Sequence, residues 1–279
     1  MLLRPRPLTW GIVSDIGFSR FVAVGDSQTE GLWDGDDTCG VVGFADRLAA
    51  TLDSLRPGLL YANLAVRGRQ IADVIDEQLP QALAMEPDLV TVCIGMNDVT
   101  RPGRGFAAAL VDLEEIYARL ADSAATVVTT TFPDVARMLP VGRFIAGRIL
   151  QINAVIRGAA HRHGFALVDL YTAPSMTEAQ TWSFDRMHAS SRGHVLFAEA
   201  AAEALGLPGS SNAWTVPVGD GRRASPLARG YAQVQWTRSL FIPWLWRHAR
   251  GRSSGDGLQP KYPVLQPVSP LVHQAHRGA

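Results

Sequence analysis

Short, continuous apolar runs alternate with longer amphipathic segments through the first 208 residues of the chain. The short runs lack the apolar–polar alternation of a half-exposed strand, and such runs are typical of strands buried on both faces. These runs occupy residues 21–25, 59–64, 89–94, 126–131 and 166–169. We therefore predict five buried strands in this part of the chain.

The longer segments carry their apolar residues at helical spacing. In residues 43–55, for example, Phe44, Leu48 and Leu52 fall on one face of a helix. The other predicted helices span residues 69–85, 106–121, 145–163 and 191–205. Helices of this length between successive strands imply parallel βαβ crossovers. The predicted fold class is therefore α/β, a three-layer α/β/α sandwich around a central parallel sheet of about five strands.

Residues 209–279 do not continue this alternation of short apolar runs and longer amphipathic segments. They contain seven prolines, the first of them Pro217, and no long periodic segment apart from about residues 228–250. Four tryptophans also lie here: Trp214, Trp236, Trp244 and Trp246. We predict that residues 1–208 form one domain and that residues 209–279 form an irregular C-terminal extension, not an independent domain.

Composition narrows the class of protein. Hydrophobic residues make up 47% of the chain and charged residues 19%, which is enough for a sizeable core and excludes a disordered chain. The only two cysteines are Cys39 and Cys93, which excludes a disulfide-stapled scaffold and a four-cysteine zinc site. No apolar run reaches the ~18 residues of a membrane-spanning helix. The N-terminus lacks a convincing export signal, so we expect a cytoplasmic location.

The formal net charge of the chain is zero, but the charge is unevenly distributed along the sequence. Residues 1–208 hold 17 Arg against 24 Asp and Glu, a net charge of −7, whereas residues 209–279 hold eight Arg, one Lys and two Asp, a net charge of +7. The basic, tryptophan-rich residues 228–250 suit two partners, an anionic membrane surface or the body of this chain or of a second copy in a homo-oligomer. We favour docking on protein, because the segment lacks a continuous amphipathic stripe; we expect no nucleic-acid partner.

Polar residues follow the predicted strands where each strand ends. In open parallel sheets, ligands bind at this edge, so side chains there are the first candidates for chemistry. The edge offers Ser27, the backbone amide of Gly68, Asn97, and the pair Asp185 and His188. Hydrolytic acyl transfer needs a nucleophile, a base, a group that orients the base, and hydrogen-bond donors for an oxyanion. Each of these parts has a candidate here.

These residues resemble those of the SGNH (GDSL-type) hydrolase family over roughly residues 20–207. Residues 25–31, Gly-Asp-Ser-Gln-Thr-Glu-Gly, are similar to the first block of the family, and residues 95–98, Gly-Met-Asn-Asp, match its Gly-x-Asn-Asp block. Asp185 and His188 match the last block. The middle block, residues 63–68, keeps Asn63 and Gly68 but has Ala65 where a glycine is usual.

The resemblance implies a role for each residue. Ser27 would be the nucleophile at the start of a helix, His188 the general base, and Asp185 the group that orients the imidazole. The backbone N–H groups of Ser27 and Gly68 and the side-chain amide of Asn97 would form the oxyanion hole. This mechanism requires no metal and no cofactor.

Structural alternatives exist for several of these residues. Ser27 or Asp26 could simply cap a helix, and Asn97 could stabilise a turn. We assign Asp26 a structural role and expect Asp98 to stabilise its loop. The other histidines and the cysteines are expected to be structural or solvated, namely His161, His163, His194, Cys39 and Cys93.

Residues 251–255, Gly-Arg-Ser-Ser-Gly, formally match the nucleophile elbow G-x-S-x-G of another hydrolase fold. That motif needs a strand before it and a helix after it, whereas here it lies in the proline-rich extension. We therefore reject Ser253 as a nucleophile.

The prediction that follows is a metal-independent serine esterase or acylhydrolase with a flavodoxin-like sandwich and a small-molecule ester or acyl substrate. A thioester or an acetylated sugar remains open as the substrate. Two loops, residues 32–42 and 134–147, should wall the site, and the apolar character of the second suggests an acyl chain. The alternative from another class is a catalytically idle interaction protein that uses its basic aromatic extension.

Overall fold

The structure is a computed structural model that describes residues 17–36, 40–101, 105–138, 140–219, 234, 237–241 and 255–268. Five parallel strands form most of a six-stranded sheet in the order β7-β6-β5-β1-β4-β8. The parallel strands are β1 (Arg20–Gly25), β4 (Leu60–Asn63), β5 (Leu89–Cys93), β6 (Thr126–Thr130) and β7 (Ala166–Val168). Their order, taken along the chain, is the 2-1-3-4-5 order of flavodoxin-like sheets, which confirms the predicted fold class.

Strand β8 (Tyr262–Pro267) comes from the C-terminal extension and pairs antiparallel with β4. The sequence analysis did not predict this strand, because Pro263 and Pro267 argue against a central strand. Proline is tolerated at the edge of a sheet, where one side of the strand needs no partner, and β8 lies at such an edge. A separate two-stranded sheet joins β2 (Gly35–Asp36) and β3 (Gly40–Val41).

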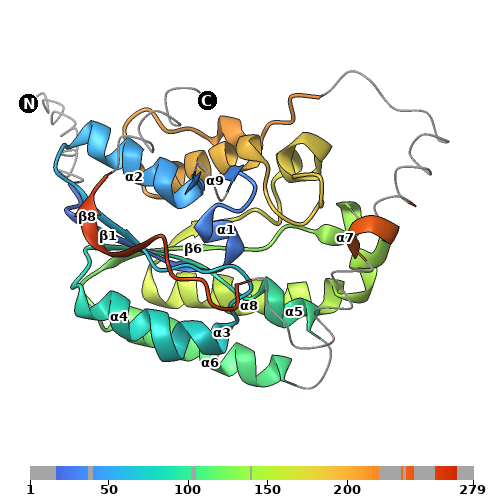
Figure 1. The fold of residues 1–279 in the computed structure, drawn as a ribbon, viewed down its shortest axis with the longest axis horizontal. Helices are drawn as coiled ribbons and strands as arrows, with labels where there is room; N and C mark the ends of the chain where they lie inside the picture. Colours follow the sequence, from blue (N-terminus) through green and yellow to red (C-terminus); the bar gives the residue numbers. More distant parts are fainter. Residues whose placement is uncertain are drawn as a thin grey trace, which may run out of the picture.

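Helices cover both faces of the sheet (Figure 1). Helices α2 (Phe44–Leu55) and α9 (Ser191–Ala204) pack together on one face, and α6 (Phe106–Ala121) and α8 (Ala146–His163) pack together on the other. All four begin and end within one residue of their predicted bounds. The core between the layers consists mainly of buried valine, leucine, isoleucine and alanine side chains.

The predicted helix over residues 69–85 is divided into three pieces: α3 (Ile71–Asp73), the π-helical turn η1 (Val74–Gln78) and α4 (Leu79–Ala84). Pro80 has no N–H for an ordinary helical hydrogen bond, and the wider π turn accommodates it. The turn also points Gln78 at the end of β1. Gly25 N–H donates to Gln78 Oε1 at 2.8 Å, and Gln78 Nε2 donates to Gly25 O at 2.9 Å.

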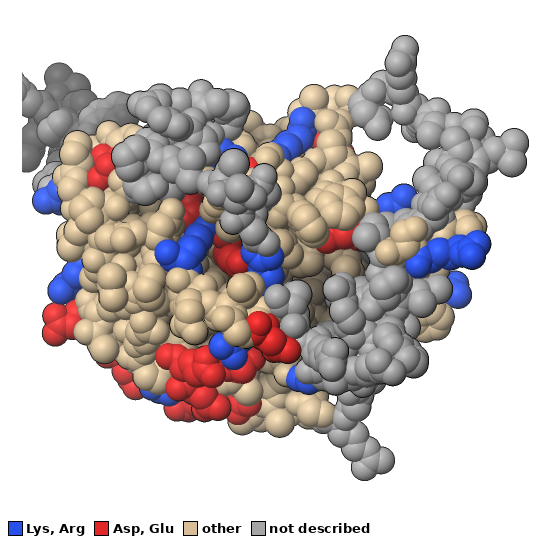
Figure 2. Space-filling view, viewed as in Figure 1, with Lys and Arg blue, Asp and Glu red and all other residues tan. Residues whose placement is uncertain are grey.

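Short helical pieces complete the described fold. They are α1 (Ser27–Glu30), α5 (Met96–Thr100), α7 (Val135–Met138), η2 (Pro140–Phe144), η3 (Pro174–Thr177), η4 (Ala179–Thr181), η5 (Asn212–Thr215) and η6 (Thr237–Phe241). Within the described ranges, no helix is both long and apolar enough to span a bilayer. Figure 2 shows acidic side chains gathered over the region of α3 and α4. Asp76 and Glu77, in η1 between these two helices, are exposed.

Several sequence predictions fall on residues that the structure does not describe. Cys39, Ser253 and most of residues 228–250 lie outside the described ranges, so the two candidate partners of that segment remain predictions. Cys93 is described and is buried in β5, as expected of a residue that fills the core, and burial raises the pKa of its thiol.

Candidate active site

A tight turn from β1 into α1 presents Ser27 at the sheet edge. Gly25, the last residue of β1, has a φ of +152°, and a Cβ there would lie 2.3 Å from Cys93 O. Asp26 caps the helix by accepting a hydrogen bond from Gln28 N–H at 3.2 Å. The cap is therefore Asp26, as the sequence analysis allowed, and Ser27 is the first helical residue, with its hydroxyl left for other contacts.

A compact loop between Trp182 and Ala189 carries the Asp–His pair. Ser183 N–H donates to His188 O at 2.9 Å, and Trp182 and Ala189 form an isolated β-bridge. Asp185 Oδ1 accepts hydrogen bonds from the Ser183 hydroxyl at 2.7 Å and from the backbone N–H groups of Met187 and His188 at 2.9 and 3.0 Å. The three-residue spacing from Asp185 to His188 thus lets one carboxylate oxygen fold the loop while the other faces the imidazole.

Ser27, His188 and Asp185 form one chain of hydrogen bonds. His188 Nε2 lies 2.9 Å from Ser27 Oγ, and His188 Nδ1 lies 2.7 Å from Asp185 Oδ2. A carboxylate can only accept, so Nδ1 carries the proton and Nε2 is free to accept from the serine hydroxyl. Burial by itself would raise the pKa of Asp185, but the hydrogen bond and charge of His188 outweigh it and hold that pKa well below its usual range.

Two further residues, Trp33 and Gln28, hold the hydrogen-bonded Ser27, His188 and Asp185 side chains in place. The sequence analysis predicted neither of them. Trp33 Nε1 donates to Asp185 Oδ2 at 2.7 Å, the same oxygen that accepts from His188. Gln28 spans the backbone on either side of His188: its Nε2 donates to Met187 O, and its Oε1 accepts from Ala189 N–H, each at 3.2 Å. The partners lie more than 150 positions apart in the sequence, so no local pattern indicates either contact.

Trp33 and Phe184 also form an exposed aromatic pair. Trp33 is 42% exposed and Phe184 59% exposed, and their rings meet edge to face with centroids 4.6 Å apart. Polar contacts of the buried Asp34 hold the loop that carries Trp33. The Asp34 carboxylate forms an ion pair with Arg47 at 2.9 Å and accepts a hydrogen bond from the Ser191 hydroxyl. A rigid apolar surface therefore lies directly beside the Asp–His pair.

The two predicted backbone donors of the oxyanion hole lie on turns at the sheet edge. Gly68 has a φ of +79°, in the left-handed region that favours glycine. Within the part of the chain that the structure describes, no hydrogen bond to another protein group is found for the N–H of either Ser27 or Gly68. Both N–H groups therefore remain available to a ligand.

Asn97 lies at the start of α5, and its side-chain amide is already engaged. Nδ2 donates to Asp26 Oδ2 at 3.1 Å and to Arg69 O at 2.9 Å. These bonds join the turn at Asp26, between β1 and α1, to the segment that follows Gly68. An oxyanion would have to share one of these N–H groups, so the role predicted for Asn97 stays a prediction.

The remaining predicted side chains have structural surroundings. Asp98 accepts from Ile71 N–H at 3.2 Å and so stabilises the start of α3. His194 is fully buried, accepts from Phe44 N–H at 3.3 Å, and has its pKa lowered to about 4 by burial. His161 and His163 are exposed at the end of α8.

Burial raises the pKa of Asp26, which is only 2% exposed, from 3.8 to about 7. The folded protein therefore holds this proton more tightly than the unfolded chain, so the stabilisation is complete below pH 3.8 and is lost as the pH rises towards 7. Three pKa units correspond to about 4 kcal/mol. We expect Asp26→Asn to gain stability relative to the parent protein as the pH rises from 4 to 8, measured by urea unfolding.

Asp122→Asn is the matched control for this prediction, because it makes the same substitution at an exposed aspartate. A constant difference between the Asp26 variant and the parent protein over the same range would contradict the raised pKa.

Comparison with protein-family profiles identifies the family of this chain. The sequence profile of the family described as GDSL-like Lipase/Acylhydrolase matches residues 23–196, more than half of the chain. The chain belongs to this family, whose members are hydrolases of acyl esters. A search of curated protein sequences found no significant match.

Solved structures with this fold cover most of the described domain. LAE5, an alpha/beta hydrolase enzyme from the metagenome of Lake Arreo, Spain, is 26% identical with a TM-score of 0.57, over 67% of this chain and 95% of that one. Axe2, an acetylxylan esterase from Geobacillus stearothermophilus, is 20% identical with a TM-score of 0.55, over 69% and 96%. A putative GDSL-like lipase from Parabacteroides merdae is 19% identical with a TM-score of 0.55, over 68% and 96%.

Proposed function

We propose that this protein is a serine ester hydrolase in which Ser27 is the nucleophile, His188 the general base and Asp185 the residue that orients it. The observation that carries the proposal is the hydrogen-bonded chain from Ser27 Oγ through His188 to Asp185 Oδ2. Family membership supplies the reaction class, and the geometry supports the assignment of roles within it. Three of the Axe2 structures are described as catalytic mutants in which an aspartate, a histidine or a serine is replaced by alanine.

The proposed reaction has two steps. His188 Nε2 takes the proton of Ser27 as the serine oxygen attacks the ester carbonyl, and the same proton then passes to the departing alcohol as the C–O bond breaks. Water next attacks the acyl-serine, gives its proton to His188, and releases the carboxylic acid as Ser27 regains a proton. The Asp185 carboxylate stabilises the imidazolium that forms in each step.

The oxyanion of each tetrahedral intermediate would be held by the N–H groups of Ser27 and Gly68, with Asn97 as the proposed third donor. The Asn97 amide can serve only if the oxyanion shares an N–H with Asp26 or with Arg69 O, the two acceptors it has in the structure. Removing one such donor typically slows catalysis by ~100- to 1000-fold.

Acetylated carbohydrates are the substrate class we propose to test first. Axe2, which shares the fold, is described as an acetylxylan esterase. The exposed faces of Trp33 and Phe184 beside the Asp–His pair would offer a sugar ring an apolar surface. Thioesters and longer acyl esters are the alternatives, because the apolar residues of the loop over residues 134–147 would suit an acyl chain.

A fluorophosphonate probe tests the mechanism, because it reacts covalently only with an activated serine. We expect stoichiometric labelling of Ser27, located by peptide mass spectrometry, and hydrolysis of p-nitrophenyl esters whose rate depends on acyl length. Acetylated xylo-oligosaccharides and acyl thioesters complete the panel of substrates. A chain that neither reacts with the probe nor hydrolyses any member of the panel would instead be an idle interaction protein.

A further inference from the structure

The C-terminal extension contacts the C-terminal end of α1, the helix that begins at Ser27. The family profile ends at residue 196. Strand β8 and the turn before it therefore lie beyond the part of the chain that the family accounts for. Despite this, they pack on the body, with β8 paired to β4.

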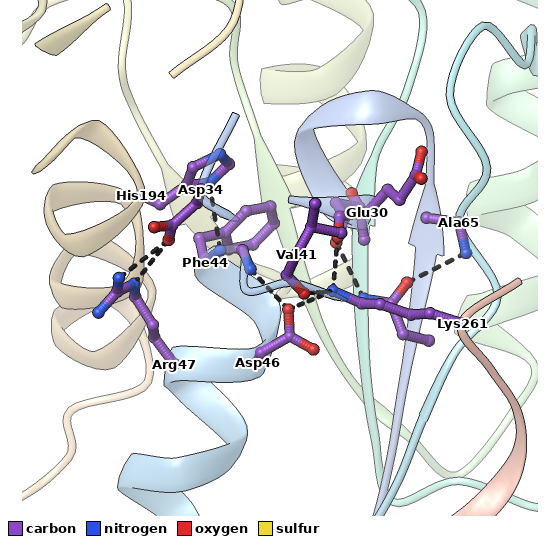
Figure 3. Close-up of polar contacts among 12 residues, drawn as sticks. Glu30, Asp34, Val41, Phe44, Asp46, Arg47, Ala65, His194 and Lys261 are labelled. Carbon is purple, nitrogen blue, oxygen red and sulfur yellow. Dashed lines mark hydrogen bonds and ion pairs between the residues drawn. The ribbon is translucent and has the colours of Figure 1, made fainter. Parts of the chain in front are cut away.

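Lys261, immediately before β8, is the only lysine in the sequence, and its side chain points into the body (Figure 3). Nζ donates to Glu30 O and to Asp46 Oδ2, each at 2.5 Å, and to Val41 O at 3.2 Å. An ammonium group has three N–H donors, so these three acceptors satisfy it completely. The side chain is 16% exposed, and that of Asp46 is fully buried.

Each acceptor belongs to a segment that meets α1. Glu30 is the last residue of α1, whose first residue is Ser27, so Lys261 binds the carbonyl end of the helix that carries the nucleophile. Asp46 accepts from Gly43 N–H at 2.6 Å, and Gly43 lies so close to Gly31 that a Cβ on Gly43 would be 2.6 Å from Gly31 Cα. Lys261 thus fixes both the end of α1 and the residues against which it packs.

A second contact reaches the loop that carries Gly68. The Glu30 carboxylate accepts from the Arg67 backbone N–H at 2.7 Å and from the Arg67 guanidinium at 2.7 and 2.9 Å. On the other side of this loop, Gly255 of the extension lies so close that a Cβ there would be 1.9 Å from Arg67 O. The extension therefore contacts the two segments that supply the proposed backbone donors.

We propose that Lys261 is a positioning residue for the active site: together with the turn at Gly255, it fixes α1 and the loop at Gly68 so that Ser27 and the two backbone N–H groups keep their relative placement. The inference rests on the proposed function, because it concerns the same nucleophile and donors. A shift of about 1 Å between such groups can cost about 100-fold in rate. The extension is then part of the catalytic unit.

The alternative is that Lys261 serves only as the counter-ion of Asp46. Lys261→Met alone leaves a buried carboxylate without its partner and threatens the fold itself. The double variant Asp46→Asn, Lys261→Met removes both charges. The amide at position 46 can still accept from Gly43 N–H and donate to the Tyr61 hydroxyl, so we expect the double variant to fold. The contact of Lys261 with Glu30 O is lost in both variants.

The experiment compares the full-length parent protein, the double variant and two further variants. Gly255→Ala pushes the turn away from Arg67 without touching the charge pair. Gln81→Ala is the control, because Gln81 Nε2 donates to Pro263 O at 2.7 Å and ties the same strand to α4. For each protein we would measure the melting temperature, kcat and KM on p-nitrophenyl acetate, and the rate of fluorophosphonate labelling at Ser27.

We expect the double variant to melt cooperatively, with kcat and the labelling rate about 10- to 100-fold lower and KM changed less than kcat. Gly255→Ala should lower kcat several-fold, and Gln81→Ala should not change it. A folded double variant with the kcat of the parent protein would overturn the positioning role. If the double variant does not fold, an unchanged kcat in Gly255→Ala would overturn it instead. A parent protein whose Ser27 does not react with the probe would overturn the proposed function and this inference with it.

Discussion

Replacing Ser27 with alanine is expected to abolish ester hydrolysis and leave a folded protein. In serine hydrolases, loss of the nucleophile typically lowers kcat by about a millionfold, because the remaining groups of the triad act only as a unit with it. The stability cost should be small, since Asp26 caps α1 and the serine hydroxyl contributes one hydrogen bond, worth about 0.5–1.5 kcal/mol. Initial rates on p-nitrophenyl acetate and a thermal melt measure both effects.

Ser253→Ala is the control for this experiment, because Ser253 lies in the other short motif that formally resembles a nucleophile site. Its replacement should leave turnover and fluorophosphonate labelling unchanged. Turnover retained by the Ser27 variant would assign the nucleophile elsewhere, and parallel loss of activity in the Ser253 variant would reopen the motif at residues 251–255.

The sequence predicted the five central strands because burial on both faces leaves a simple signal. Residues 126–131 are β-branched throughout, and β6 occupies residues 126–130. Strand β8 carries no such signal: Pro263 and Pro267 interrupt it, and its partner β4 lies about 200 positions earlier in the chain. An edge strand of this kind is defined by what it pairs with and not by its own residues.

The sequence predicted that residues of the site lie close together where those residues follow the ends of parallel strands. Ser27, Gly68 and Asn97 each follow a parallel strand, and parallel strands bring their carboxyl ends to one edge. The residues that hold the site were not predictable, because their side chains act at a distance along the sequence. In the sequence, Trp33 is an aromatic residue in a predicted loop and Lys261 is an isolated cation. Only the fold brings Trp33 to Asp185 and Lys261 to Glu30.

Replacing His188 with alanine is expected to lower turnover nearly as much as the serine replacement does, because His188 Nε2, 2.9 Å from Ser27 Oγ, is the proposed acceptor of the Ser27 proton. Asp185→Asn should be milder. The new amide would keep its oxygen on the backbone N–H groups of Met187 and His188 and turn its NH2 toward the imidazole, which favours the wrong tautomer. Trp33→Phe should be milder still, since it removes one hydrogen bond to Asp185 Oδ2 and leaves that from His188 Nδ1 in place. Values of kcat for the three variants measure this order.

The pH profile of the parent protein tests the same assignment independently. Only the neutral imidazole can accept the serine proton, so the rate should rise with pH as the imidazole loses its proton. Asp26, whose pKa is raised to about 7 by burial, also loses its proton as the pH rises. Asp26→Asn separates the two groups: if His188 is the base, the rise persists in this variant. A flat profile from about pH 5 to 9 with chemistry rate-limiting would contradict His188 as the base, and a rise that disappears in the Asp26 variant would assign the titration to Asp26 instead.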